Sequence, residues 1–263
     1  MQILGFALAA LIGLSLGLLG GGGSVLTVPV FVYVLGFDPK DAIAMSLPVV
    51  GATSLVGAAS HWRSGNVRVK TALLFGVVAM AGSYGAARIL APLMSGALQL
   101  ALLAVVMLAA AISMFRSAGR GPALVAEGDR PLALPLLGLV ALSVGAMTGI
   151  VGIGGGFLIV PALVLLARVP IKEAIGTSLL VIAMNTASGY VGYAGRTTMA
   201  WGFLAGFTLI AIGGILAGAR LVQYVSQAQL KRAFAVFLIA VGAFVLVQNR
   251  HALVPTARAA ETR

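Results

Sequence analysis

Charge and cysteine are what this sequence has least of. Of its 263 residues only 9% are charged and 60% are hydrophobic, whereas a soluble domain carries about 25% charged residues. So few charges cannot cover a surface in water, and the mean hydropathy of +1.10 agrees. We therefore predict an all-α polytopic membrane protein. The sequence has no cysteine, which excludes disulfides and thiolate metal sites.

Acidic residues are also scarce, six in all, and none lies inside a long apolar segment. Asp38, Asp41 and Glu173 stand at segment edges, which argues against a proton relay or a cation path built on buried carboxylates. With no intramembrane acid pair we predict no enzymatic activity, no metal and no cofactor. The net charge is +11, but the basic residues occupy short gaps between apolar segments, as topology signals and lipid contacts do. Nucleic acid is not an expected partner.

Cutting the chain at its charged residues leaves eight long uncharged segments, and six of them have the length of one membrane helix. About 20 apolar residues span a bilayer as one helix. The segments 1–37 and 131–167 are longer and equal in length. One helix of that length would be roughly 55 Å long, while two full crossings with a turn need more residues. Each holds a glycine cluster near its middle. We predict a broken helix folded into a hairpin within the membrane, with a kink in one long helix as the alternative.

These two segments belong to an internal repeat. "GLLGGGGSVLTVP" at 17–29 and "GIVGIGGGFLIVP" at 149–161 align when the numbering is shifted by 132, and the same offset aligns the segments that follow. We call this shift the repeat offset. The predicted organisation is membrane repeat 1 at 1–115, a cytoplasmic linker loop at 116–131, membrane repeat 2 at 132–250 and a C-terminal tail at 251–263.

The positions of lysine and arginine bear on whether the repeats are parallel or inverted. If each glycine segment crosses once, the repeats are parallel and the basic residues divide ten to seven. If each is a hairpin, the repeats are inverted and the division without the tail is eleven to three. The positive-inside rule favours inversion, with both termini outside. Inverted repeats with broken helices are typical of secondary transporters, whose substrate sites lie near the midplane.

A glycine cluster between two half-helices offers what an anion needs. Glycine permits positive φ and close approach to the backbone. The second half-helix points free N–H groups and a partial positive charge at the break. Close helix packing is the alternative use of glycine in membranes. The predicted substrate-binding backbone comprises Gly21, Gly22, Gly23 and Ser24 in the first copy and Gly154, Gly155 and Gly156 in the second.

Neutral hydrogen-bonding side chains follow each glycine cluster at equivalent positions. Uncharged donors suit an anion that must bind and then leave, although a bond from each hydroxyl to its own helix is the alternative. The predicted substrate-binding side chains are Ser46, Thr53, Ser54, Ser178, Asn185 and Thr186. His61 is the only histidine near the membrane and is our candidate for proton coupling. An interfacial position beside Trp62 is its alternative.

Taken together, these motifs resemble the sulfite exporter TauE/SafE family of bacterial membrane transporters. The match rests on the two glycine motifs, on "AIAMSLPVVGATS" at 42–54 with its partner "AIGTSLLVIAMNTASG" at 174–189, and on "HWRSGNV" at 61–67. The resemblance implies a permease, often an exporter, for sulfite, thiosulfate, sulfoacetate or other organosulfonates. Since members also move other organic anions, a carrier of another small anion and an anion channel stay open as alternatives. The expected partners are a small anion and the lipid bilayer, and the oligomeric state stays open, a homodimer included.

Overall fold

The computed structural model describes residues 2–118, 134–151, 154–165, 167, 169–193 and 199–248. Within these residues the chain is helical apart from short connections, and no strand occurs among them. In the part of the chain that the structure describes, six helical stretches are long and apolar enough to cross a membrane. The predicted tail at 251–263, and the predicted linker from residue 119 onward, lie outside the described residues.

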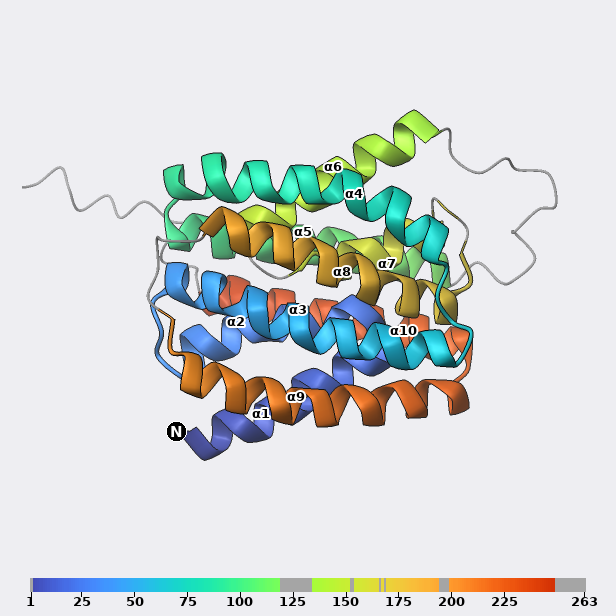
Figure 1. Cartoon of the computed structure of the whole chain (residues 1–263), viewed down its shortest axis with the longest axis horizontal. Coiled ribbons are helices and arrows are strands. Elements are labelled where there is room, and N and C mark those ends of the chain that lie inside the picture. Colours follow the sequence, from blue (N-terminus) through green and yellow to red (C-terminus); the bar gives the residue numbers. More distant parts are fainter. Residues whose placement is uncertain are drawn as a thin grey trace, which may run out of the picture.

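Figure 1 shows the helices lying roughly along one common direction. The first half contains α1 (Gln2–Leu19), the short turns η1 (Gly20–Leu26), α2 (Thr27–Pro29) and η2 (Val30–Val34), then α3 (Pro39–Arg63), α4 (Val69–Gly85) continued by η3 (Ala86–Leu90) and η4 (Ala91–Leu93), and α5 (Gly96–Ala118). The second half contains α6 (Leu134–Val151), α7 (Gly156–Leu165), α8 (Ile171–Tyr193), α9 (Trp201–Leu221) continued by η6 (Val222–Tyr224), and α10 (Gln227–Gln248).

Local sequence explains why α3 and α8 begin where they do. Proline is the first residue of α3, Pro39, a position where its missing N–H and fixed φ cost nothing. A single carboxylate occupies the first turn of each helix, Asp41 in α3 and Glu173 in α8. A negative charge there is favoured by the helix dipole. Asp41 and Glu173 are related by the repeat offset, so the repeat includes its helix-start signals.

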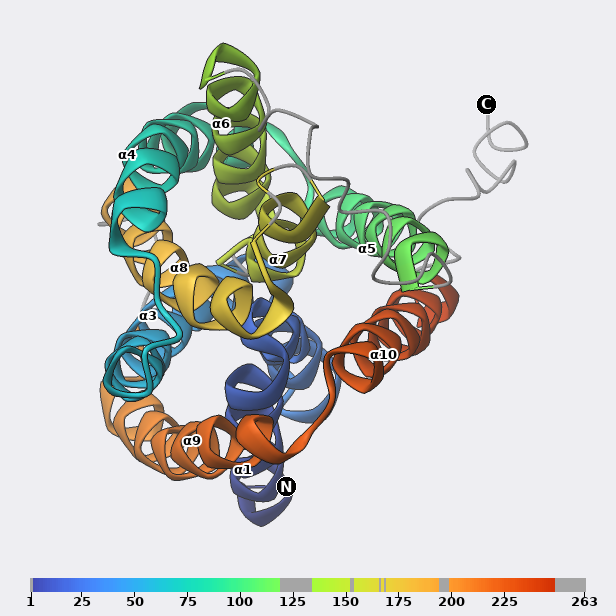
Figure 2. The ribbon, with the colours of Figure 1, turned by 90° about the vertical axis from the view of Figure 1, so that its right-hand side faces the viewer.

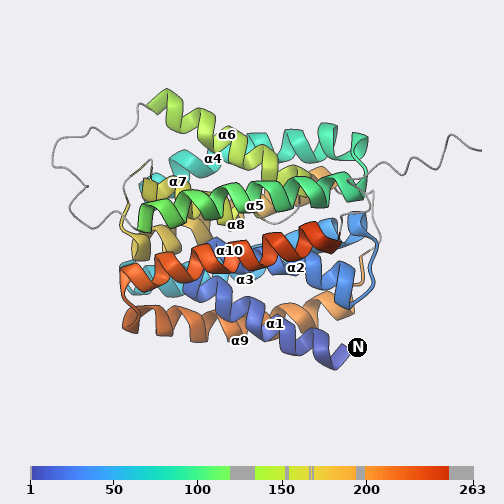
Figure 3. The ribbon, with the colours of Figure 1, turned by 180° about the vertical axis from the view of Figure 1, so that it is seen from behind.

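The two halves are interwoven. α1 packs along α9 of the other half, α6 packs along α4, α3 lies on α8, and α5 lies on α10. Because α1 corresponds to α6 and α4 to α9 in the repeat, every one of these contacts has an equivalent or joins two equivalent helices. Seen along the helices in Figure 2, α1, α3 and α9 form one lobe, and α4, α6 and α8 form another. Figure 3 shows α5 and α10 side by side across the opposite face from that seen in Figure 1.

Glycines allow α1 to approach α9 closely and α6 to approach α4. A Cβ on Gly13 of α1 would lie 1.9 Å from the carbonyl oxygen of Ala211 in α9. A Cβ on Gly145 of α6 would lie 1.9 Å from the carbonyl oxygen of Ala79 in α4. Small residues at a helix contact bring backbones together, which is how helices associate in lipid. Both pairs obey the repeat offset, so the sequence repeat is also a repeat of contacts.

The first glycine segment folds back on itself. The chain turns at Gly20, which has a φ of 66°. After the turn, a Cβ on Gly23 would lie 2.7 Å from the carbonyl oxygen of Ile12, and a Cβ on Gly5 would lie 2.8 Å from Leu35 Cδ2. In a straight helix Gly5 and Leu35 would be about 45 Å apart. The segment is therefore a hairpin, and one long kinked helix is the wrong alternative here.

The second glycine segment also reverses direction. Gly154 and Gly155 have φ angles of 72° and 68°, which favour glycine over any residue with a side chain. A Cβ on Gly155 would lie 2.0 Å from Thr148 Oγ1 and 3.4 Å from Val144 Cγ1. A straight helix would separate Gly155 and Val144 by about 16 Å. Residues 152 and 153 of this cluster lie outside the described residues.

Candidate functional site

The tips of the two hairpins meet, backbone against backbone. A Cβ on Gly21 would lie 1.8 Å from the Cα of Gly156, and a Cβ on Gly156 would lie 2.1 Å from the Cα of Gly21. Real Cβ atoms do not approach so closely, so neither position admits a side chain unless the backbones move apart. Gly22 and Gly23 are buried next to this contact. The glycine clusters from the two halves thus form one structure.

One face of α8 supports both tips. A Cβ on Gly20 would lie 2.8 Å from Ser178 Oγ, while a Cβ on Gly154 would lie 2.7 Å from Ile182 Cγ2 and 3.0 Å from Thr186 Cγ2. Residues four apart share a helix face, so Ser178, Ile182 and Thr186 form a continuous surface under the tips. Two predicted site residues, Ser178 and Thr186, are therefore next to the glycines.

Five of the predicted hydroxyl groups donate to nearby backbone carbonyls. The bonds are Ser24 Oγ to Gly21 O (2.6 Å), Ser46 Oγ to Ile43 O (2.7 Å), Thr53 Oγ1 to Val49 O (2.7 Å), Ser178 Oγ to Ile175 O (2.8 Å) and Thr186 Oγ1 to Ile182 O (2.7 Å). This is the usual local bond of serine and threonine. These hydroxyls would donate to an anion only after giving up such a bond.

Ser54 and Asn185 behave differently. Both are 0% exposed, and neither Ser54 Oγ nor the Asn185 amide nitrogen and oxygen has a hydrogen-bond partner among the described residues. A buried polar group without a partner loses the free energy of its hydration with no compensation. Ser54 lies on α3 and Asn185 on α8. Of the predicted side chains, these two have donors that a ligand could engage without breaking an existing bond.

A groove of about 380 Å³ lies between α3 and α8. Its apolar walls include Gly51 and Leu55 of α3 and the residues equivalent to them in the repeat, Ala183 and Ala187 of α8. Thr186 also lines it, and the other side of Thr186 touches Gly154 of the second tip. The groove is thus lined by equivalent residues of both halves, and Thr186 lies between it and the second tip.

The His61 side chain is buried within the protein. It is 1% exposed, whereas its neighbour Trp62 is 65% exposed. The His61 Nε2 atom is 3.1 Å from the carbonyl oxygen of Gly17. Because a carbonyl only accepts, Nε2 carries the proton and donates it. Gly17 belongs to the last turn of α1, whose carbonyls have no partner within the helix. His61 is therefore packed inside the protein near the end of α3, and proton coupling by His61 and an interfacial position both stay predictions.

Two further polar residues at the hairpins lie outside the predicted substrate-binding set. The Tyr193 hydroxyl donates to the carbonyl oxygen of Gly149 over 3.1 Å. Gln99 is 1% exposed, and its Nε2 donates to the carbonyl oxygen of Ile150 over 2.9 Å. Both bonds satisfy carbonyls at the end of α6. The available signals were the repeat offset, which relates His61 to Tyr193, and a lone glutamine inside an apolar segment.

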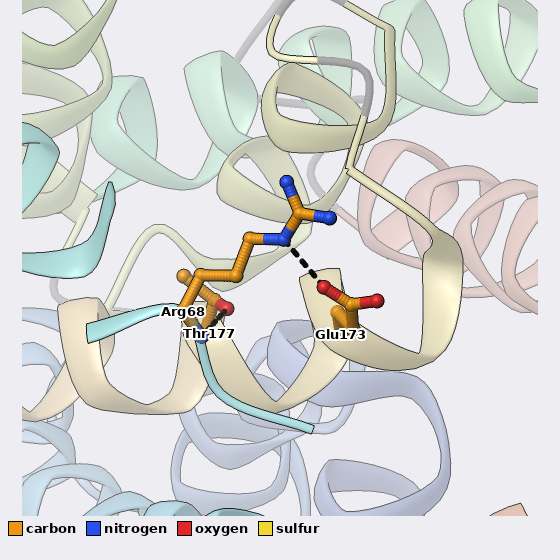
Figure 4. A network of polar contacts seen from close by, with 3 residues as sticks. All are labelled: Arg68, Glu173 and Thr177. Atoms are coloured by element: carbon orange, nitrogen blue, oxygen red, sulfur yellow. Dashed lines mark hydrogen bonds and ion pairs between the residues drawn. The ribbon is translucent and has the colours of Figure 1, made fainter. Parts of the chain in front are cut away.

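A polar contact joins the loop after α3 to the start of α8. The Arg68 backbone N–H donates to Thr177 Oγ1 over 2.9 Å, and the Arg68 side chain forms an ion pair with Glu173 (Figure 4). Both charged side chains are partly exposed, so the pair itself stabilises the fold little. Its position matters more, because a Cβ on Gly176 of the same helix would lie 2.9 Å from His61 Cβ. The contact covers the end of α3 where His61 lies.

Comparison with known proteins places this architecture. The family model described as Sulfite exporter TauE/SafE matches residues 5–245. A probable membrane transporter protein of Xylella fastidiosa is 34% identical over 249 residues, covering 93% of this chain and 94% of that protein. One of Methanocaldococcus jannaschii is 26% identical over 258 residues, covering 91% and 95%. No solved structure matches significantly. With its apolar helices, the chain is a multi-pass membrane transporter and belongs to the TauE/SafE sulfite exporter family.

Proposed function

We propose that this protein is a secondary transporter that exports sulfite, or a related small sulfur oxyanion or organosulfonate, across a bacterial inner membrane. The observation that carries the proposal is the contact of the glycine tips at Gly21 and Gly156, with the unpartnered donors of Ser54 and Asn185 on α3 and α8. The family assignment supports transport as the activity. The substrate and the direction are our inference.

The chemistry of the site favours a small anion. Hydrogen bonds from the Asn185 amide and the Ser54 hydroxyl are neutral, so they can hold a charged ligand without trapping it. Irregular backbone inside a membrane is tolerated where it lines a cavity or is packed in protein, and glycine lets a ligand approach it closely. The carboxylates Asp41 and Glu173 stand at helix starts, and among the described residues none lies deeper in a membrane-spanning helix. An anion near the tips would therefore meet no buried negative charge.

We propose further that the two halves are inverted repeats. In Figure 1 the colours run from left to right along α3 and from right to left along its counterpart α8, which supports opposite orientations. The loops after α3 and after α9 also meet, since the Gln223 side chain donates to Ser64 Oγ over 3.2 Å. The inverted arrangement places these two loops on one side of the membrane, and the parallel arrangement would separate them.

Inversion provides a route for alternating access. In an inverted repeat each half makes equivalent contacts to its own hairpin, on opposite sides of the membrane. A transporter of this type opens these contacts on one side while those on the other side stay closed. An anion held by the donors of Ser54 or Asn185 would be open first to one side and then to the other. The groove between α3 and α8 is the space next to the tips into which these helices could move.

Flux into proteoliposomes tests this function. The purified protein would be reconstituted and assayed with labelled sulfite, thiosulfate, sulfoacetate, taurine and chloride, with empty liposomes as the control. Saturable flux of one or more sulfur anions, with little chloride flux, is the expected result. Chloride flux that does not saturate would establish the anion channel instead. Absence of flux for every sulfur anion would contradict the proposed substrate class.

A further inference from the structure

Each half has, at one shared position of the repeat, a side chain that donates to the end of its own broken helix, and at the end of α6 Gln99 of the first half donates as well. His61 donates to the carbonyl oxygen of Gly17, and Tyr193 donates to that of Gly149, both over 3.1 Å. The repeat offset relates His61 to Tyr193 and Gly17 to Gly149. The accepting carbonyls lie in the last turns of α1 and α6, where the helix itself supplies no donor. Two unlike residues therefore make the same contact at equivalent places.

The two contacts lie toward opposite ends of the molecule. His61 is in the last turn of α3 and Tyr193 is the last residue of α8, and these helices run in opposite directions in Figure 1. His61 is 1% exposed and Tyr193 is 7% exposed. Each contact fastens a broken helix to a membrane-spanning helix of its own half, between the glycine tips and one end of the molecule.

We propose that His61 and Tyr193 are positioning residues that act as two latches, each holding the site closed toward one side of the membrane. The proposal rests on the proposed transport function, because a carrier must seal its site on each side in turn. Removing a latch takes one hydrogen bond from the end of α1 or α6 and favours the state open at that end. A neutral hydrogen bond is worth about a fivefold change in such an equilibrium, and the two latches shift it in opposite directions.

The surroundings of His61 fit a seal. Its Cβ lies 2.9 Å from where a Cβ on Gly176 would be, and that added Cβ would lie 2.1 Å from the carbonyl oxygen of Asn66. The loop after α3 and the first turns of α8 are thus packed over the histidine, and the Arg68–Glu173 pair fastens that loop from outside. An opening at this end requires these elements to separate from the end of α1.

The absence of cysteine allows a direct test. Ser54→Cys places one thiol at a fully buried position whose hydroxyl has no partner among the described residues. Its labelling by a membrane-impermeant maleimide would be timed in right-side-out and inverted membrane vesicles without substrate. On this background we compare His61→Leu, Tyr193→Phe and the control His61→Gln, which keeps an N–H donor.

We expect His61→Leu to speed labelling about fivefold from one side only, and Tyr193→Phe to speed it about fivefold from the other side. His61→Gln should label like its parent. Equal acceleration from both sides would mean general loosening and would overturn the proposal, as would unchanged labelling in Tyr193→Phe, which loses one oxygen and should insert normally. The assay contains no substrate, so a failed latch and a failed substrate assignment give separate results.

Discussion

The backbones of Gly21 and Gly156 touch at the point where the two hairpins meet. A Cβ added to either residue would lie within 2.1 Å of the Cα of the other. The two residues come from different halves of the chain. The contact therefore joins the halves at the place where the proposed site must open and close, and even an alanine side chain at either position must move the two backbones apart.

Alanine at Gly21 or at Gly156 should abolish most transport. The added methyl forces the tips apart, and overpacking of this kind costs about 1–3 kcal/mol. We expect anion flux to fall at least tenfold when normalised to the amount of inserted protein. Gly213→Ala is the matched control, because a Cβ there meets nothing within 4 Å. Normal flux in both tip variants would show that the contact has no part in transport.

Alanine at Ser54 should raise stability while it weakens transport. Replacing a buried hydroxyl that lacks a partner removes an uncompensated desolvation cost of about 1–3 kcal/mol, so the melting temperature in detergent should rise or stay level. The concentration for half-maximal flux should increase several-fold because a donor to the anion is lost. Ser178→Ala, which removes a hydroxyl bonded to its own helix, gives the comparison. A drop in stability with unchanged flux would mark Ser54 as structural.

Enlarging Gly13 and Gly145 should destabilise the protein by similar amounts. Each residue lies against a backbone carbonyl of a helix from the other half, and an added Cβ would be 1.9 Å from that oxygen in both cases. Leucine at either position separates α1 from α9 or α6 from α4, and membrane helices depend on such packing. Thermal unfolding followed by aggregation in detergent measures the effect. A large loss at one position and none at the other would contradict the equivalence of the two contacts.

Sided labelling of single cysteines decides between inverted and parallel repeats. Ser64→Cys and Ser226→Cys lie in exposed loops after α3 and after α9, and inversion places both in the cytoplasm. Ser95→Cys, exposed before α5, should react from the periplasm. The membrane-impermeant reagent is applied to intact cells and to inverted vesicles. Labelling of residues 64 and 226 from opposite sides would establish parallel repeats.

The sequence predicted where the helices of this fold lie along the chain better than it predicted which helices pack together. The repeat offset correctly identified equivalent helices, and the length of the glycine segments indicated hairpins. The offset shows which helices are equivalent, but it does not show which helices touch. The packing of α1 on α9 and of α6 on α4, each in the other half, could therefore not be predicted. The sequence likewise does not tell which glycines are needed for close packing. A Cβ on Gly13 would collide with a backbone carbonyl, while a Cβ on Gly213 would meet nothing within 4 Å. Only the distance to a neighbouring helix in the folded protein distinguishes the two glycines.

The site was predictable only in part, for a similar reason. The composition indicated neutral donors near the glycines, and Ser178 and Thr186 do lie against the tips. Which donors stay without a partner depends on the side chain as well as the position, because Thr53 bonds the carbonyl of Val49 in its own helix while Asn185, at the equivalent position, has no partner among the described residues. The bond of His61 to Gly17 joins two different helices and has no local sequence signal.

Calorimetric titration of sulfite into the purified protein tests most directly whether the site binds an anion. Wild type, Asn185→Leu and Thr53→Val would be compared under anaerobic conditions in the same detergent. Asn185→Leu removes a buried donor without a partner among the described residues, and Thr53→Val removes a hydroxyl already bonded to its own helix. We predict that wild type and Thr53→Val bind sulfite alike and that Asn185→Leu binds it at least tenfold more weakly. Equal binding by all three proteins would contradict an anion site built on Asn185.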